Sequence, residues 1–510
     1  MVETAQQQDG DMAALAKGGR TNFIGFLLRL VARIPFLFIA GQLYGAQALG
    51  RFASALVVVE LLALVCSMGE KRGLAQRLAN SDEPESNLVL DGLLLALLLS
   101  VIAGTFLWFV PDPMFPNGMN GPLDKLLVFA IPGFAMTEVA LAAQAYRFDI
   151  ATTVRARSLA EPWTISIAAG VLYFVAPASG LALAYLASIY AALIVALWPF
   201  LKTFGRPQGW RPRPRNIGSM TLRALPLAGA DAVEWGSRRL DIFILGLFAA
   251  PYAVGIYYVA QQVASLPQKM KTSFEPILGP VITKNLKKGD NTAIADQLSQ
   301  VGFWIIAAQA GIGLALGLPG EGVMGLVGSE FVGGTGALGF LLLAEVVAAT
   351  AVVSEAALVY VARIKNLWIS LATIGLQAVL TVGAMLGVER MGLAGGYKAA
   401  GAAIALMLSL GLAALIKAKL LGHILGQPIR TWRWVLVWAA VPATAVGITM
   451  QYVVEWAQLL FGIPLILFVY GIIIWTRGFG PEDRLLFRRN LASDTEPLPP
   501  EPGPESTRIR

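Results

Sequence analysis

Residues 22–45 read NFIGFLLRLVARIPFLFIAGQLYG and predict a membrane-spanning helix that carries charge. The stretch is long enough to cross a bilayer, since about 20 residues at about 1.5 Å each cover about 30 Å of hydrocarbon. Arg29 and Arg33 interrupt it, and their spacing of four residues places both on one helix face. We expect Arg33 near the bilayer midplane, where a charge usually faces a polar cavity or a partner.

A weaker copy of this stretch follows in the second half of the chain. Residues 239–260 read RLDIFILGLFAAPYAVGIYYVA, and residues 33–55 show the same order of features: an arginine, a mostly apolar exit, a short loop, and a glycine followed by an aromatic residue. The offset is about 205 residues, as between Gly50 and Gly255. Weak internal symmetry of this kind is typical of transporters, whose sites lie between the repeats.

The composition predicts an all-α polytopic membrane protein. Hydrophobic residues make up 56% of the 510 residues and charged residues only 14%, against about 25% charged in soluble domains. The apolar stretches predict about 14 transmembrane helices. We expect two pseudo-symmetric six-helix bundles, at 22–201 and 226–416, and two further helices within 434–476.

The basic residues predict the orientation of these helices. With the N-terminus in the cytoplasm, 31 of the 39 Lys and Arg residues fall in cytoplasmic segments and only 3 on the opposite side. This bias follows the positive-inside rule, so we expect a multi-pass protein of the inner (cell) membrane with both termini cytoplasmic. The cytoplasmic segments would include a tail at 1–21, a basic linker at 202–225 and a disordered tail at 490–510. Because the net charge of +7 lies in loops between spans, it predicts no nucleic-acid partner.

The sequence lacks the motifs of common enzymes. It has no Gly-x-x-x-x-Gly-Lys-Ser/Thr phosphate loop, no His-Glu-x-x-His and no Gly-x-Ser-x-Gly. Cys66 is the single cysteine and His423 the single histidine, which excludes an internal disulfide and a cysteine or histidine metal cluster. We therefore expect a protein that is not an enzyme and uses no metal or cofactor.

Ionisable residues inside predicted spans are the candidate functional residues, because they cannot face lipid. The seventh span is the densest. Offsets of 3, 7 and 10 residues from its first acidic residue define one stripe, with Arg239 on an adjacent face. The stripe consists of Asp231, Glu234, Arg238 and Asp241.

Carboxylates in other predicted spans are candidates for ion coupling. Glu60 lies near the middle of the second span and is a candidate counter-ion for Arg33, and Glu138 lies in the fourth span. Burial raises the pKa of a carboxylate, so Glu60, Glu138, Asp231 and Glu234 could take up and release protons and couple transport to an ion gradient. The tenth span adds Glu345 and Glu355.

Short motifs occur at matching places in the two halves. The first half carries Gly18-Gly-Arg-Thr before the arginines, then Tyr44-Gly45 and Leu49-Gly50-Arg-Phe-Ala. The second half carries RLDIFILG at 239–246, VGIYYVA at 254–260 and FEPILGP at 274–280. With the predicted span layout, these motifs resemble the multidrug/oligosaccharidyl-lipid/polysaccharide exporter superfamily, and its Wzx-type polysaccharide flippases in particular.

The resemblance implies a function and a set of site residues. The substrate would be an oligosaccharide linked to an isoprenoid pyrophosphate. Two rocking bundles would move it by alternating access from the cytoplasmic to the outer leaflet, for O-antigen, capsule or exopolysaccharide synthesis. Arg29, Arg33, Arg238, Arg239 and Asp241 match family positions where charge lines the central cavity. Guanidinium groups suit a pyrophosphate because they bind it through paired hydrogen bonds.

The resemblance also implies partners and leaves alternatives open. H+ or Na+ would be the coupling ion, and a polysaccharide polymerase and a chain-length regulator would be protein partners. One alternative is a cation-coupled small-molecule or drug antiporter of the same fold, and another is a lipid II flippase. A membrane enzyme of glycan assembly is a third, although the short outer loops leave no room for a folded catalytic segment.

Overall fold

Long apolar stretches form helices throughout the computed structural model, which describes residues 34–207, 209–212, 214–268, 282, 286 and 291–480. These residues contain no strand. A helix bonds its backbone groups within one segment, which satisfies them where no water is present. The expectation of an all-α polytopic protein is confirmed for this part of the chain.

Within the described ranges, ten helical segments are long and apolar enough to cross a membrane, so the chain is a multi-pass membrane protein. Val435–Met450 is apolar but shorter. The number of 14 helices stays a prediction. The ten segments are Ile34–Ala79, Glu85–Phe109, Pro122–Tyr146, Ile150–Val175, Gly180–Phe204, Asn291–Gly317, Ser329–Val361, Arg363–Arg390, Gly396–Leu425 and Glu455–Gly478.

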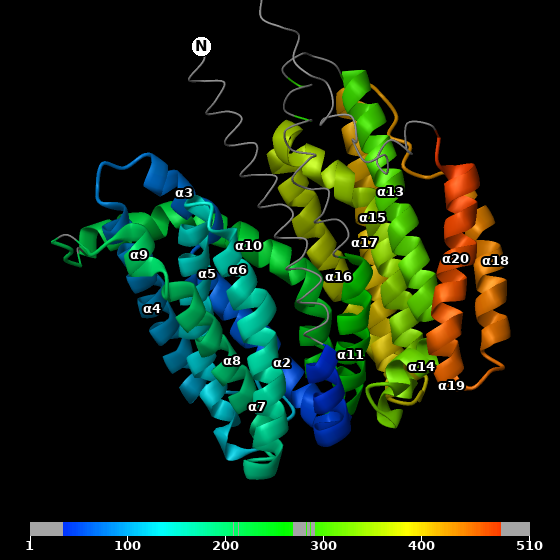
Figure 1. Cartoon of the computed structure of the whole chain (residues 1–510), viewed down its shortest axis with the longest axis horizontal. Helices are drawn as coiled ribbons and strands as arrows, with labels where there is room; N and C mark the ends of the chain where they lie inside the picture. Colours follow the sequence, from blue (N-terminus) through cyan, green and yellow to red (C-terminus); the bar gives the residue numbers. More distant parts are fainter. Residues whose placement is uncertain are drawn as a thin grey trace, which may run out of the picture.

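The N-terminal half is one group of helices, drawn from blue to teal in Figure 1. The segment Ile34–Ala79 is not one straight helix, because Gly45 adopts a φ of +78° that glycine tolerates without strain. The helices of this half are α2 (Gly45–Cys66), α3 (Glu70–Ala79), α4 (Glu85–Phe109), α5 (Ala130–Tyr146), α6 (Ile150–Val154), α7 (Glu161–Val175), α8 (Gly180–Leu197) and α9 (Phe200–Phe204).

The C-terminal half forms a second group, drawn from green to orange, and a final helical pair packs on its far side against α13 (Figure 1). Its helices are α10 (Pro214–Phe248), α11 (Pro251–Gln268), α13 (Asn291–Gly317), α14 (Gly320–Gly325), α15 (Thr335–Val361), α16 (Arg363–Arg390) and α17 (Gly396–Leu425). The final pair comprises α18 (Val435–Met450) and α20 (Ile463–Ile473), preceded by the short α19 (Glu455–Ala457).

Helix α10 joins the two halves and begins earlier than the sequence predicts. Residues 202–225 were expected to be a linker, but α9 extends to Phe204 and α10 starts at Pro214, so only 205–213 connect the two helices. Proline suits the first helical turn because its missing N–H has no partner there in any case. With 35 residues the helix is about 50 Å long, and it runs diagonally from α9 to α11 in Figure 1.

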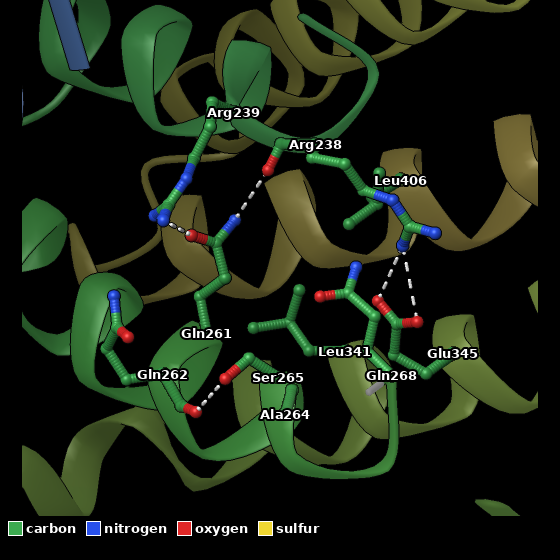
Figure 2. Close-up of a pocket in the computed structure, with 10 residues that line it drawn as sticks. All are labelled: Arg238, Arg239, Gln261, Gln262, Ala264, Ser265, Gln268, Leu341, Glu345 and Leu406. Carbon is green, nitrogen blue, oxygen red and sulfur yellow. Dashed lines mark hydrogen bonds and ion pairs between the residues drawn. The ribbon is translucent and has the colours of Figure 1, made fainter. Parts of the chain in front are cut away.

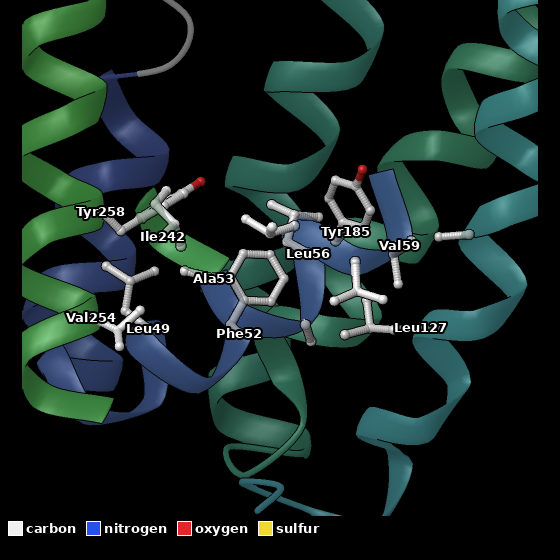
Figure 3. Close-up of a cluster of buried hydrophobic side chains, with 14 of the residues drawn as sticks. Leu49, Phe52, Ala53, Leu56, Val59, Leu127, Tyr185, Ile242, Val254 and Tyr258 are labelled. Carbon is white, nitrogen blue, oxygen red and sulfur yellow. The ribbon is translucent and has the colours of Figure 1, made fainter. Parts of the chain in front are cut away.

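Helix α2 is the inner helix of the N-terminal half. Figure 3 shows its side chains Leu49, Phe52 and Leu56 between α11 on one side and helices of its own half on the other. Val254 of α11 and Tyr185 of α8 close this cluster, and all five side chains are buried. Tight apolar packing thus connects the halves through α2.

The two halves meet at one end through their glycines. A Cβ on Gly50 would lie 1.8 Å from the carbonyl oxygen of Pro251, and a Cβ on Gly255 would lie 2.0 Å from that of Ala46. Each glycine therefore faces the residue four positions before the other. This reciprocal contact joins the positions that the sequence repeat pairs at an offset of 205 residues, and small residues let such helices approach closely. We call this the closed end.

Polar contacts between the halves reinforce the closed end. Glu330, in the short 3-10 helix Ser329–Gly334 before α15, accepts a hydrogen bond from the Ala46 N–H at 2.9 Å, where α2 begins. Asn117, in the loop after α4, donates to the carbonyls of Gly246 and Ala249 at 2.8 and 3.1 Å, where α10 ends. Each half thus satisfies helix-terminal groups of the other that would otherwise lack partners. Away from this end the two groups diverge toward α3 and the start of α13 (Figure 1).

Candidate functional site

A polar pocket lies among the helices of the C-terminal half. Its volume is about 70 Å³, and it opens to solvent. Four helices line it: α10 and α11 supply its polar side chains, α15 supplies a carboxylate, and α17 supplies Leu406. Figure 2 shows Arg238 and Arg239, neighbours on α10, approaching the pocket from its upper edge.

Arg238 forms an ion pair across the pocket. Its Nη1 lies 3.0 Å from Oε1 and 3.3 Å from Oε2 of Glu345 on α15. The side chains are 27% and 11% exposed, so the pair is neither sealed nor fully solvated. Gln268 lies beside it, and its amide oxygen accepts from Arg238 Nε at 3.2 Å when oxygen and nitrogen are assigned by their partners.

Arg239 forms a hydrogen bond with the neutral side chain of Gln261. Its Nη1 donates to Oε1 of Gln261 at 3.0 Å, and Gln261 Nε2 in turn donates to Asp241 Oδ2 at 3.1 Å and to the Arg238 carbonyl at 3.2 Å. Asp241 is fully buried and also accepts from the Tyr257 hydroxyl. Asp241 therefore lies behind the pocket and orients Gln261, whereas the two arginines line the pocket itself.

The amide-rich face of α11 was missed by the sequence reasoning. Gln261, Ser265 and Gln268 follow at intervals of four and three residues, which places them on one face, and Gln262 also lines the pocket. The polar stripe within a predicted apolar span was the sequence signal that could have identified these residues. Amides and hydroxyls offer both donors and acceptors, as hydroxyl-rich ligands require.

The predicted stripe on α10 does not face one cavity. Arg72 of α3 lies 3.1 Å from Asp231 and 2.5 Å from Glu234, so these two carboxylates bind the N-terminal half. Arg238 and Asp241 lie further along the helix, within the C-terminal half. The stripe divides because α10 is long enough to change neighbours along its length.

Glu138 belongs to a separate charged group in the N-terminal half. Arg157 binds both Glu138 and Glu161, the latter at 2.6 Å, and is only 8% exposed. Glu161 follows Arg157 by four positions, a spacing that is typical of an ion pair within one helix. Glu60 is half-buried on α2 and forms no ion pair with another described residue.

Two predicted residues cannot be placed. Arg29 and Arg33 lie outside the described residues. No cluster of three or more His, Cys, Asp or Glu side chains with the geometry of a metal site occurs among the residues that the structure describes.

Comparison with solved structures identifies the fold. The chain is similar to the lipid II flippase MurJ in an inward closed conformation, with a TM-score of 0.65 and 12% identity over 90% of this chain and 98% of that one. It is also similar to an inward-facing multidrug resistance MATE family transporter of the MOP superfamily (TM-score 0.62, 16% identity, 78% and 94% covered). A MOP superfamily transporter from Pyrococcus furiosus, described as having a binding pocket of reverse polarity, matches at a TM-score of 0.56 (16% identity, 81% and 95% covered). At these identities the likeness shows that this chain shares the fold of these proteins.

The family follows from the sequence itself. A family model described as polysaccharide biosynthesis protein matches residues 42–301, just over half of the chain. The chain therefore belongs to this family, and the predicted resemblance to polysaccharide flippases of the MOP superfamily is confirmed. No curated protein matches the chain.

Proposed function

We propose that the protein moves an oligosaccharide linked to an isoprenoid pyrophosphate from the cytoplasmic to the outer leaflet of the inner membrane. The observation that carries this proposal is the pocket in which Arg238 and Arg239 lie beside uncharged amides. Guanidinium groups recognise phosphate oxygens through paired hydrogen bonds, and the partly dry surroundings strengthen the attraction. The family membership supports a role in polysaccharide synthesis.

The rest of the pocket suits the sugar. Gln262 and Ser265 line the pocket on α11, and Gln268 of the same helix lies beside Arg238. Saccharide hydroxyls both donate and accept hydrogen bonds, and amide side chains do the same. A headgroup with its pyrophosphate at α10 and its first sugar along α11 satisfies both kinds of group.

Alternating access would follow from the arrangement of the halves. With both termini cytoplasmic, the closed end faces outward and the diverging end faces the cytoplasm, where the substrate is made. Arg29 and Arg33 of the first span would extend the cationic surface, and Glu60, Glu138, Asp231 and Glu234 would bind and release H+ or Na+ as the halves move. A polysaccharide polymerase and a chain-length regulator would take up the product.

A deletion strain tests this function against its alternatives. Loss of the gene should remove surface polysaccharide, and the wild-type chain should restore it while resistance to cationic drugs stays unchanged. A deletion strain that keeps its polysaccharide but becomes drug-sensitive would favour the antiporter. A strain that is rescued by a lipid II flippase, and that stops growing without one, would favour lipid II as substrate.

A further inference from the structure

We propose that Glu345 competes with the substrate's phosphate groups for Arg238. The ion pair seen here would then be an internal stand-in for the bound headgroup. This inference rests on the proposed function, since it concerns the same pocket. It assigns to Glu345 the regulation of headgroup binding and release.

The geometry gives Glu345 the position of a ligand. Both of its carboxylate oxygens lie near one guanidinium nitrogen of Arg238, at 3.0 and 3.3 Å. A phosphate that binds Nη1 of Arg238 uses the same N–H groups, so the two anions compete for this nitrogen. Both side chains line the pocket and keep some exposure, so an entering anion can reach the pair.

The charge balance of the pocket also supports competition between Glu345 and the phosphate groups. Among its lining residues, Glu345 cancels the charge of one of the two arginines, while Arg239 donates to the neutral Gln261. A pyrophosphate diester carries a negative charge on each phosphate. Displacement of Glu345 leaves two guanidinium groups for two phosphates, and its return to Arg238 helps to expel the headgroup after transport.

A positioning role makes the opposite prediction. If Glu345 only oriented Arg238 for the substrate, then removing its charge would weaken binding, because an unpaired guanidinium loses its preferred geometry. If Glu345 competes, then removing its charge strengthens binding. The sign of the effect therefore separates the two roles.

The same helix offers a matched control. Glu355 also lies on α15 and also forms an ion pair, with Lys417 Nζ at 3.2 Å, but neither residue lines the pocket. Glu355→Gln makes the same chemical change ten positions away. It reports any general effect of removing a carboxylate from α15.

Binding of undecaprenyl pyrophosphate to the full-length protein in lipid nanodiscs, measured by native mass spectrometry, tests the proposal. We expect Glu345→Gln to bind about tenfold more tightly than the wild type, which corresponds to about 1.4 kcal/mol, and Glu355→Gln to bind like the wild type. In the Arg238→Gln background, Glu345→Gln should have no effect, because the shared cation is gone. Glu345→Ala, which also frees Arg238, should change binding in the same direction and serves if the glutamine variant does not fold.

The outcomes distinguish this inference from the proposed function. Unchanged or weaker binding by Glu345→Gln, together with weaker binding by Arg238→Gln, would overturn the competition and leave the headgroup site in place. Binding that survives both Arg238→Gln and Arg239→Gln would overturn the site, and with it the role of Glu345.

Discussion

Arg238 Nη1 lies 3.0 Å from Glu345 Oε1, so an arginine of α10 and a carboxylate of α15, 107 residues apart in sequence, meet inside one polar pocket. The contact crosses between helices that are not consecutive in the chain. It makes the pocket a property of the C-terminal half as a whole.

The pocket predicts unequal effects of substitutions at Arg239. Arg239→Gln should lower polysaccharide export by about tenfold or more, since a charge-assisted hydrogen bond to phosphate is lost. Arg239→Lys should restore only part of it, because a point charge cannot replace the planar fork. Surface polysaccharide in the complemented deletion strain, normalised to protein in the membrane, measures this. Equal export by both variants would contradict a role of the planar guanidinium group of Arg239 in export.

The sequence predicts similar effects on export for substitutions at Arg33. Arg33→Ala should abolish export while the protein still inserts, and Arg33→Lys should rescue it in part. The same export assay applies, with Lys398→Gln as a control outside the pocket lining. Normal export by Arg33→Ala would exclude this residue from the mechanism.

The network behind the pocket should affect stability rather than charge recognition. Tyr257→Phe removes a hydrogen bond to the fully buried Asp241 and should lower the free energy of unfolding by about 1–3 kcal/mol. Thermal unfolding of the purified protein in detergent measures this, with Tyr452→Phe, at a side chain that is 89% exposed, as the variant expected to unfold like the wild type. A Tyr257→Phe protein as stable as the wild type would contradict the prediction.

The closed end should not tolerate a side chain at its glycines. A Cβ on Gly50 would lie 1.8 Å from a backbone oxygen of the other half, so Gly50→Ala must separate α2 from α11 and should cost about 1–3 kcal/mol. Gly375→Ala on α16 is the control, because a Cβ there meets no atom within 4 Å. Equal unfolding temperatures for the two variants would show that the halves do not pack through this contact.

The predicted orientation can be tested by labelling. Cys66 is the single cysteine, so Cys66→Ala gives a background without thiols. In it, Met119→Cys, in the loop after α4, should react with a membrane-impermeant maleimide in spheroplasts. Arg211→Cys, between α9 and α10, should react only after permeabilisation. The reverse pattern would place the closed end in the cytoplasm.

Periodic features of the sequence predicted the fold well. Apolar spans and an internal repeat gave the helical architecture, and the reciprocal contact of Gly50 and Gly255 joins the positions that the repeat aligned. The start of α10 was missed because proline and arginine occur both in linkers and in first helical turns.

The site was only partly predictable. Arg238 and Arg239 stood out because charge is costly in a membrane. Glu345 also stood out as a carboxylate within a span, but its pairing with Arg238 was not predicted. Glu345 reaches Arg238 only through tertiary packing, and Gln261 and Gln268 are uncharged and attract no attention in a scan for ionisable residues. Helix periodicity placed Asp231 and Asp241 on one stripe, but it contains no information about which helices lie opposite.

Flipping in proteoliposomes tests the central claim most directly. The purified protein is reconstituted with a fluorescent undecaprenyl-pyrophosphate oligosaccharide, and a membrane-impermeant quencher reports the fraction in the outer leaflet over time. The wild type should equilibrate the lipid between leaflets, and the double variant Arg238→Gln/Arg239→Gln should be no faster than empty vesicles. Equal flipping by the wild type and the double variant would contradict the claim that these guanidinium groups carry the headgroup across the membrane.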